Sequence, residues 1–160
     1  MRRWRRGAAA LMVLVSVSCW ASGPSGAPAD PGPRDRCPVC GMFVAGFANW
    51  VATIVFADGT QAFFDGPKDM LTFYFDPGKY DPKRDRSDVE ALFVTEYYST
   101  RRVPVEAVYF VLGSDVLGPM GRELVPVSGR KRAETFLRDH QGTRMLRFSE
   151  LSAEILSDLR

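Results

Sequence analysis

The sequence predicts an α+β fold in which two repeated β-β-α-β units, each with a small antiparallel sheet, are followed by a C-terminal helix. Two observations lead to this prediction. Strand-like and helix-like patterns occur in the same order in both halves of the chain. A shift of 63 residues also superimposes four identical residue pairs, which are Gly66 on Gly129, Lys68 on Lys131, Thr72 on Thr135 and Phe73 on Phe136. An internal repeat of this kind determines the architecture of a domain.

The first unit is expected to open with a β-hairpin. Residues 49–56 are rich in β-branched and aromatic side chains, which favour a strand. Asp58-Gly59 is a strong hairpin signal, so residues 60–64 are predicted to form the returning strand.

A helix and a third strand are expected to complete this unit. Asp65 is a residue type that caps helices. Residues 68–75 carry apolar side chains at helical spacing, and Asp76-Pro77-Gly78 ends the pattern. A charged loop then precedes a strand at residues 90–95.

The second unit is expected to repeat this order with a longer turn between its first two strands. Ser128 is the predicted cap of a helix that runs to about His140. The other predicted elements are strands at residues 107–112, 124–127 and 144–148, a turn at 113–121 and a closing helix at 150–159.

The N-terminus has the pattern of a secretion signal. An arginine-rich start precedes a short apolar run that ends just before Cys19, so residues 1–18 are predicted to be a signal peptide. The pattern resembles a bacterial lipoprotein signal, in which Cys19 would be lipidated; the alternative is a plain signal peptide. Residues 19–36 are dominated by Pro, Gly, Ala and Ser and are expected to form a flexible linker. The two units are assigned to residues 37–100 and 101–160.

The charge balance gives no indication of nucleic-acid binding. The chain has a formal charge of +2, but four of its 21 basic residues lie in the predicted signal and none of its 19 acidic residues does. The exported chain therefore has 17 basic and 19 acidic residues and a formal charge of −2. A nucleic-acid-binding domain would show a basic surface instead.

The segment from Cys37 to Met42, Cys-Pro-Val-Cys-Gly-Met, places three sulfur side chains within six residues. Soft sulfur ligands favour Cu(I). A Cys-x-x-Cys pair is also found in zinc sites, in redox dithiols and, less often, as a structural disulfide. A zinc site requires four ligands and an iron–sulfur cluster needs more cysteines than the two available here. A redox motif is expected at the start of a helix after a strand, whereas this one follows a linker.

Three further side chains are candidate ligands beside Cys37 and Cys40. Met120 lies between glycine and proline residues in Gly118-Pro119-Met120-Gly121, which is typical of a turn and favours exposure of its thioether. Met42 follows Gly41 directly, and His140 is the sole histidine. A thioether cannot form a disulfide, so a cysteine–methionine site would hold Cu(I) in an oxidising compartment with less risk of oxidation.

Three motifs of this chain resemble the NosL family. They are Cys37-Pro-Val-Cys40-Gly-Met-Phe-Val, Phe63-Phe64-Asp65-Gly66, and Gly113-Ser114-Asp115 leading into Gly118-Pro119-Met120-Gly121-Arg122-Glu123-Leu124-Val125-Pro126. The resemblance extends from Cys37 to about Phe148. Family members can carry histidine near the cysteine motif, where this chain has Pro38.

The resemblance implies a non-enzymatic, membrane-anchored copper-binding lipoprotein on the periplasmic face of a bacterial membrane. Such a metallochaperone would supply Cu(I) for the maturation of nitrous oxide reductase, with that enzyme and its copper-assembly membrane complex as partners. The family's copper site is understood to use one cysteine and one methionine, which correspond to Cys40 and Met120. The resemblance also implies a fold of paired β-β-α-β units, in which the metal lies where the two halves of the chain meet.

Two other functions remain open at this point. The chain would be a thiol–disulfide oxidoreductase if Cys37 and Cys40 acted on the copper-site cysteine of a partner. Alternatively, it would be a lipoprotein that only scaffolds other proteins. Copper binding is the only one of the three that accounts for a methionine in the Gly-Pro turn.

Overall fold

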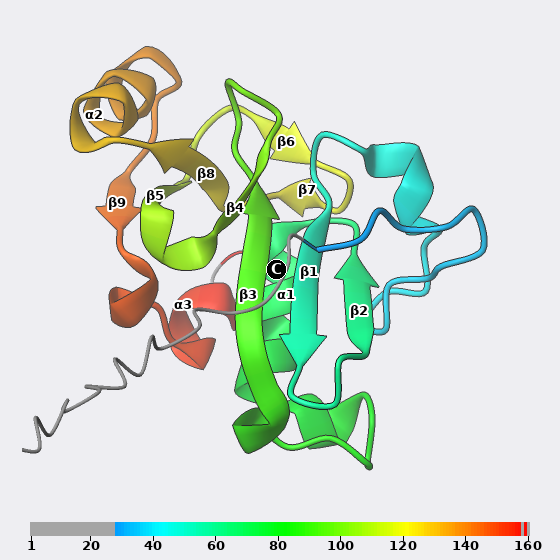
Figure 1. Cartoon of the computed structure of the whole chain (residues 1–160). Helices are drawn as coiled ribbons and strands as arrows, with labels where there is room; N and C mark the ends of the chain where they lie inside the picture. The colour runs from blue at the N-terminus through cyan, green and yellow to red at the C-terminus, as the bar shows by residue number, and fades with distance from the viewer. Residues whose placement is uncertain (1–27, 158, 160) are drawn as a thin grey trace, which may run out of the picture.

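The computed structural model describes residues 28–157 and 159 (Figure 1). The predicted signal peptide, Cys19 and most of the predicted linker lie outside the described residues. Within residues 28–157, no helix has the length and apolar character needed to cross a bilayer.

The first unit is a four-stranded antiparallel sheet with one helix across its face (Figure 1). The strands are in the order β2-β1-β3-β4, and β1 pairs with both β2 and β3. Their bounds are β1 Ala52–Phe56, β2 Gln61–Phe64, β3 Val89–Thr95 and β4 Arg102–Pro104. The turn between β1 and β2 contains Gly59 with φ +79°, a conformation that glycine adopts without steric cost.

Helix α1, Pro67–Phe75, packs on β1 and β2. Its buried side chains include Met70, Leu71 and Phe73, and the helix also contacts α3 (Ala153–Ser157), so it is buried on more than one side. The predicted cap is wrong: the N-cap residue is Gly66, and the carboxylate of Asp65 is hydrogen-bonded to a cysteine instead.

The second unit has the same topology as the first. Its strands are in the order β8-β5-β9, so the first strand is central as in the first unit, and helix α2 packs against all three. The bounds are β5 Val108–Leu112, β8 Val125–Ser128, α2 Arg130–Asp139 and β9 Arg144–Leu146. The N-cap of α2 is Gly129 with φ +81° and not Ser128. The α+β fold of two small antiparallel sheets with a C-terminal helix is thus confirmed.

Three features differ in detail from the sequence prediction. Strand β4 extends the first sheet beyond residue 100. The expected turn between β5 and β8 contains a short hairpin, β6 Leu117–Gly118 and β7 Gly121–Arg122. The closing helix α3 is limited to Ala153–Ser157, is preceded by a 3-10 turn and contacts α1.

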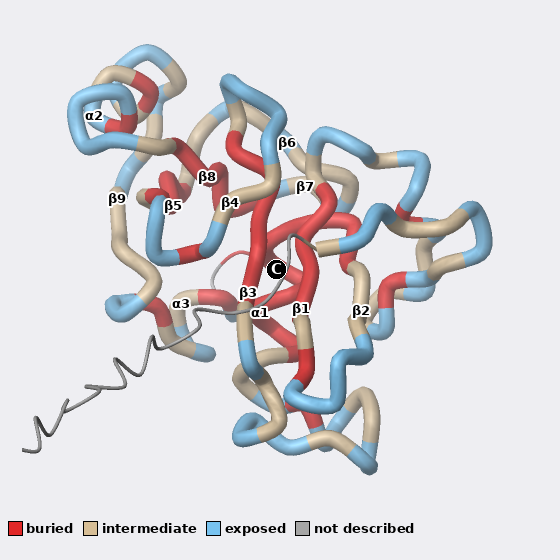
Figure 2. The backbone as a smooth tube through the Cα atoms, in the orientation of Figure 1, coloured by how far each residue is buried: buried red, intermediate tan, exposed pale blue. Residues whose placement is uncertain are grey.

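Buried apolar side chains form a larger cluster, which extends from the first sheet and α1 to strand β5, and a smaller one in the second unit. Figure 2 shows the buried segments concentrated along β1, β3 and α1. Phe64, Phe73 and Phe110 are among the largest side chains of the larger cluster, and Cys37 also belongs to it. The first sheet and α1 therefore provide a rigid support for the cysteine loop.

Candidate metal centre

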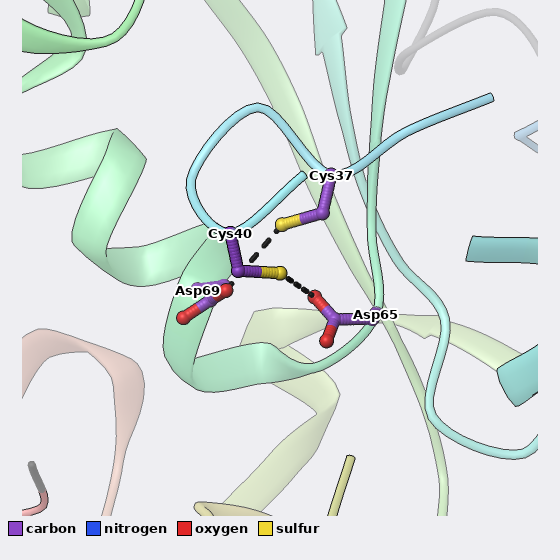
Figure 3. Close-up of side chains that lie close together, drawn as sticks. All are labelled: Cys37, Cys40, Asp65 and Asp69. Atoms are coloured by element: carbon purple, nitrogen blue, oxygen red, sulfur yellow. Dashed lines mark hydrogen bonds between the residues drawn. The ribbon is translucent and has the colours of Figure 1, made fainter. Parts of the chain in front are cut away.

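A tight loop before β1 carries both thiols of the described chain. The Cys37 amide donates to the Met42 carbonyl at 2.9 Å, and the Gly41 amide donates to the Cys37 carbonyl at 2.8 Å. Gly41 has φ +78°, which a residue with a Cβ rarely adopts, and this conformation reverses the chain. Arg36 and Phe43 form a bridge that closes the loop. The loop thereby directs Cys37 and Cys40 to the same side (Figure 3).

Two carboxylates from the first unit face these thiols. Asp65 follows β2 directly, and Asp69 lies in the first turn of α1. The Cys40 Sγ lies 3.3 Å from the Asp65 Oδ1, and the Cys37 Sγ lies 3.4 Å from the Asp69 Oδ2. The four candidate ligand atoms all lie within 4.8 Å of one another (Figure 3). Two sulfur and two oxygen atoms therefore surround a space in which one metal ion could bind.

The carboxylate of Asp65 has an unusual environment for a charged group. The residue is only 1% exposed, and its second oxygen, Oδ2, has no hydrogen-bond partner within the described residues. A buried carboxylate oxygen without a partner costs free energy, whereas a cation would satisfy it. The other buried unpaired oxygens of the described residues belong to neutral hydroxyls, of Thr53, Thr72 and Ser114. The donor set at Asp65 thus fits a bound cation.

Both thiols are protonated at neutral pH when no metal is bound. Burial raises the pKa of Cys37 well above its ordinary value, and the neighbouring Asp65 raises it further. Burial also raises the pKa of Cys40 to about 11, although backbone hydrogen bonds oppose this shift. The thiols are therefore hydrogen-bond donors to the carboxylates, and a metal must displace a proton from each cysteine that it binds.

Met120 reaches this site from the second unit. The β6–β7 hairpin carries Met120 at its turn, and the side chain is 47% exposed. Met120 and Cys40 line one cavity of about 420 Å³. The other lining residues are Val39, Lys68, Asp69, Lys79 and Tyr80. Met120 from one half of the chain and Cys40 from the other thus line the same cavity.

Two of the candidate ligands lie elsewhere. The His140 Nδ1 lies 3.0 Å from the Asp115 Oδ1, and the ring stacks on Phe136 with centroids 4.2 Å apart. His140 is the C-cap of α2 and does not line the cavity. Met42 closes the cysteine loop through its carbonyl, and its half-buried side chain is not among the cavity residues.

Asp65 and Asp69 were not predicted to be site residues. One signal in the sequence is their spacing of four, which places Asp69 one turn beyond Asp65 when a helix begins between them. Which of the chain's many acids lies near a thiol depends on the packing of the cysteine loop against α1, and no local pattern reports this.

Comparisons with known proteins identify a matching family and a solved structure with a similar fold. The family model described as NosL matches residues 28–156. The crystal structure of the copper chaperone NosL from Shewanella denitrificans is similar, with a TM-score of 0.68 and 23% identity. The match covers 82% of this chain and 98% of that one, and at this identity it supports the fold. No curated protein matches the chain.

Proposed function

The chain belongs to the NosL family, and on this basis we propose that it is a copper-binding chaperone that carries Cu(I) and has no enzymatic activity. The observation that carries the proposal is that Cys40 and Met120, from the two halves of the chain, line one cavity. The Cys40 thiol is also hydrogen-bonded to the Oδ1 of Asp65, a buried carboxylate whose Oδ2 has no partner within the described residues. Thiolate and thioether are soft ligands that select Cu(I).

The exposure of Met120 suits a carrier that must release its cargo. Cys37 and Asp65 are buried, whereas Met120 is about half exposed on a hairpin. A neutral thioether binds Cu(I) without adding charge, so an incoming soft ligand of a partner can replace it. Copper would therefore leave through the face of the cavity that Met120 lines.

The destination of the copper is proposed from the family and from the N-terminal sequence. The partners would be nitrous oxide reductase and its copper-assembly membrane complex. Lipidation at Cys19 would anchor the protein to the periplasmic face of a bacterial membrane, and a linker rich in Pro and Gly would let the domain reach its partners.

The structure argues against the oxidoreductase alternative. Reactive dithiols have lowered pKa values and lie at helix N-termini or beside cations. Here burial raises the pKa of both Cys37 and Cys40, and carboxylates face both thiols. The Cys-x-x-Cys loop leads into a 3-10 turn, Val44–Phe47, instead of an α-helix. Insulin reduction that disappears in Cys37→Ser would favour the alternative.

An anaerobic titration tests the proposed function. The reduced protein is titrated with Cu(I) against a chromophoric chelator that competes for the ion. We expect one equivalent to bind tightly enough to withdraw Cu(I) from the chelator. A chelator that keeps all of its copper would contradict the proposal.

The substitution Met120→Leu is expected to weaken Cu(I) binding at least about tenfold. In other metal sites, substitutions of residues that only support the ligands already lower metal affinity by about 10- to 100-fold, and the loss of a ligand should lower it at least as much. Leucine has a similar volume, and position 120 is half exposed, so stability should not change. The same titration measures the affinity. Met145→Leu is the matched control, because Met145 lies on β9 and packs against the second unit's core. Equal affinities of Met120→Leu and the unsubstituted protein would exclude Met120 as a ligand.

The affinity for Cu(I) is expected to rise about tenfold per pH unit between about pH 6 and about pH 8. In the metal-free protein the pKa of Cys40 is about 11, so this thiol keeps its proton over the whole range. Protons compete with the metal for the sulfur, and their competition weakens as the pH rises. Titrations at several pH values, corrected for the chelator's own protonation, measure the slope. A hundredfold rise in affinity per pH unit would indicate that Cys37 also binds as a thiolate. An affinity that does not change with pH would contradict thiolate ligation.

A further inference from the structure

Two buried side chains, those of Lys68 and Glu123, join helix α1 to the hairpin that carries Met120. We propose that Lys68 and Glu123 are positioning residues that hold this hairpin against α1 and thereby set the affinity for Cu(I), although neither binds the metal. The inference rests on the proposed function, and it adds residues outside the candidate ligand set.

The hairpin needs such support because its own structure is weak. Strands β6 and β7 have two residues each, and within the described part of the chain they pair only with one another. An isolated two-stranded hairpin is at best marginally stable in water. Its apolar side chains bury little surface, since Leu117 is 63% exposed and Met120 is 47% exposed. Contacts with another element must therefore determine where Met120 lies.

The side chain of Lys68 binds the main chain of the hairpin. The residue is only 6% exposed, and its Nζ donates to the Met120 carbonyl at 3.1 Å and to the Arg122 carbonyl at 2.6 Å. These carbonyls lie on either side of Gly121, so one ammonium group holds the end of the turn and strand β7. Hydrogen bonds from a charged donor are roughly twice as strong as neutral ones.

Glu123 makes the reciprocal contact, from the hairpin to the helix. Its side chain is 3% exposed, and its Oε1 accepts hydrogen bonds from the amides of Lys68 at 2.7 Å and Leu124 at 2.9 Å. The Lys68 amide belongs to the first turn of α1, where backbone donors have no partner within the helix. A carboxyl group from the second unit thus supplies a cap that α1 lacks locally.

Glycines on both elements make room for this carboxyl group. A Cβ at Gly66 would collide with the Glu123 Oε2, and a Cβ at Gly118 would lie 2.9 Å from the Glu123 Cγ. The side chain of Glu123 is therefore enclosed between the start of α1 and the first strand of the hairpin.

These contacts relate the thioether to the rest of the site. Asp65 lies two residues before α1 and Asp69 lies within it, so an element that supports the carboxylates also holds the Met120 main chain. A ligand held in place before the metal arrives loses less conformational entropy on binding. Contacts that hold a ligand in place without touching the metal typically change metal affinity by about 10- to 100-fold.

The test begins with Lys68→Leu, which removes the ammonium group but keeps an apolar side chain and the amide that binds Glu123, and which adds no thioether to the cavity. We expect Cu(I) affinity to fall about tenfold or more. In the metal-free protein, hydrogen exchange at the amides of residues 117, 118 and 120–122 should accelerate, while exchange in β1 stays unchanged. Lys131→Leu is the matched control, because Lys131 occupies the equivalent place on α2 and is exposed.

A double-mutant cycle shows whether the effect acts through Met120. In the Met120→Leu background, adding Lys68→Leu should change the affinity little, because the ligand that Lys68 positions is already absent. Glu123 provides an independent pair of variants. Glu123→Ala should weaken binding as Lys68→Leu does, whereas Glu123→Gln keeps the accepting oxygen and should retain the affinity.

Several results would overturn the inference. One is an unchanged affinity in Lys68→Leu and Glu123→Ala, and another is an equal loss of affinity in the presence and absence of Met120. Unchanged hairpin exchange in both variants would also overturn it. If Met120→Leu alone bound Cu(I) as tightly as the unsubstituted protein, the proposed ligand would be wrong instead, and the metal-free exchange data would still decide whether Lys68 and Glu123 hold the hairpin.

Discussion

Replacing Cys40 with serine is expected to lower the affinity for Cu(I) by more than about a hundredfold, because losing a ligand should exceed the cost of changes beyond the ligands. The substitution exchanges a soft thiolate for a hard hydroxyl, which is a poor ligand for Cu(I). Cys40 is half-buried and makes its side-chain hydrogen bond to Asp65, a bond that serine can also donate. The measurement is the competition titration, with urea unfolding to show that stability is unchanged.

Cys37→Ser is the informative companion to this variant. Cys37 is 1% exposed and belongs to the larger core cluster, so its replacement is expected to lower stability as well as to alter the site. If Cys40→Ser retained tight binding while Cys37→Ser lost it, the metal would lie deeper, between Cys37 and Asp69. That result would contradict the assignment of Cys40.

Phe73→Ala is expected to reduce the free energy of unfolding by about 3–5 kcal/mol, the usual range for a buried phenylalanine. Phe73 connects α1 to the first sheet: its ring centroid lies 6.4 Å from that of Phe56 on β1 and 5.5 Å from that of Phe64 on β2. It also stacks on Tyr80 at 6.1 Å. The total free energy of unfolding of a small domain is only about 5–15 kcal/mol, so this loss would be a large part of it. Urea unfolding of the metal-free protein measures the change.

A surface aromatic provides the control for this prediction. Phe43 is exposed and stacks under the guanidinium of Arg36, so Phe43→Ala is expected to cost no more than about 1 kcal/mol. A similar cost for both substitutions would show that Phe73 does not carry the packing of α1.

Local sequence patterns were sufficient to predict the main helices and strands. The strands β1, β2 and β3 and helix α1 lie within a few residues of their predicted places, because hydrophobic alternation, the Asp58-Gly59 turn and helical spacing are all local signals. Strand β4 was missed because its three residues become a strand only by pairing with β3. The β6–β7 hairpin was missed for a related reason, since its short strands contain glycine.

The site was predictable only in part. The two thiols share one short motif, and the turn composition around Met120 correctly indicated an exposed side chain. Asp65 was misinterpreted as a helix cap because the N-cap residue is Gly66, and the side chain that accepts from the first turn of α1 belongs to Glu123, which is distant in the sequence. Long-range contacts of this kind leave no local pattern.

The shared strand order of the two units has an evolutionary consequence. Equivalent topology, together with identical residues at the helix starts, is what duplication of an ancestral half-chain would leave behind. The two units differ at the candidate site, because Ser128 and Arg132 occupy the places that correspond to Asp65 and Asp69. The second unit instead contributes through a hairpin between its first two strands. If the halves arose by duplication and the hairpin was inserted afterwards, the ancestor lacked the thioether, and the insertion marks the origin of the two-sided site.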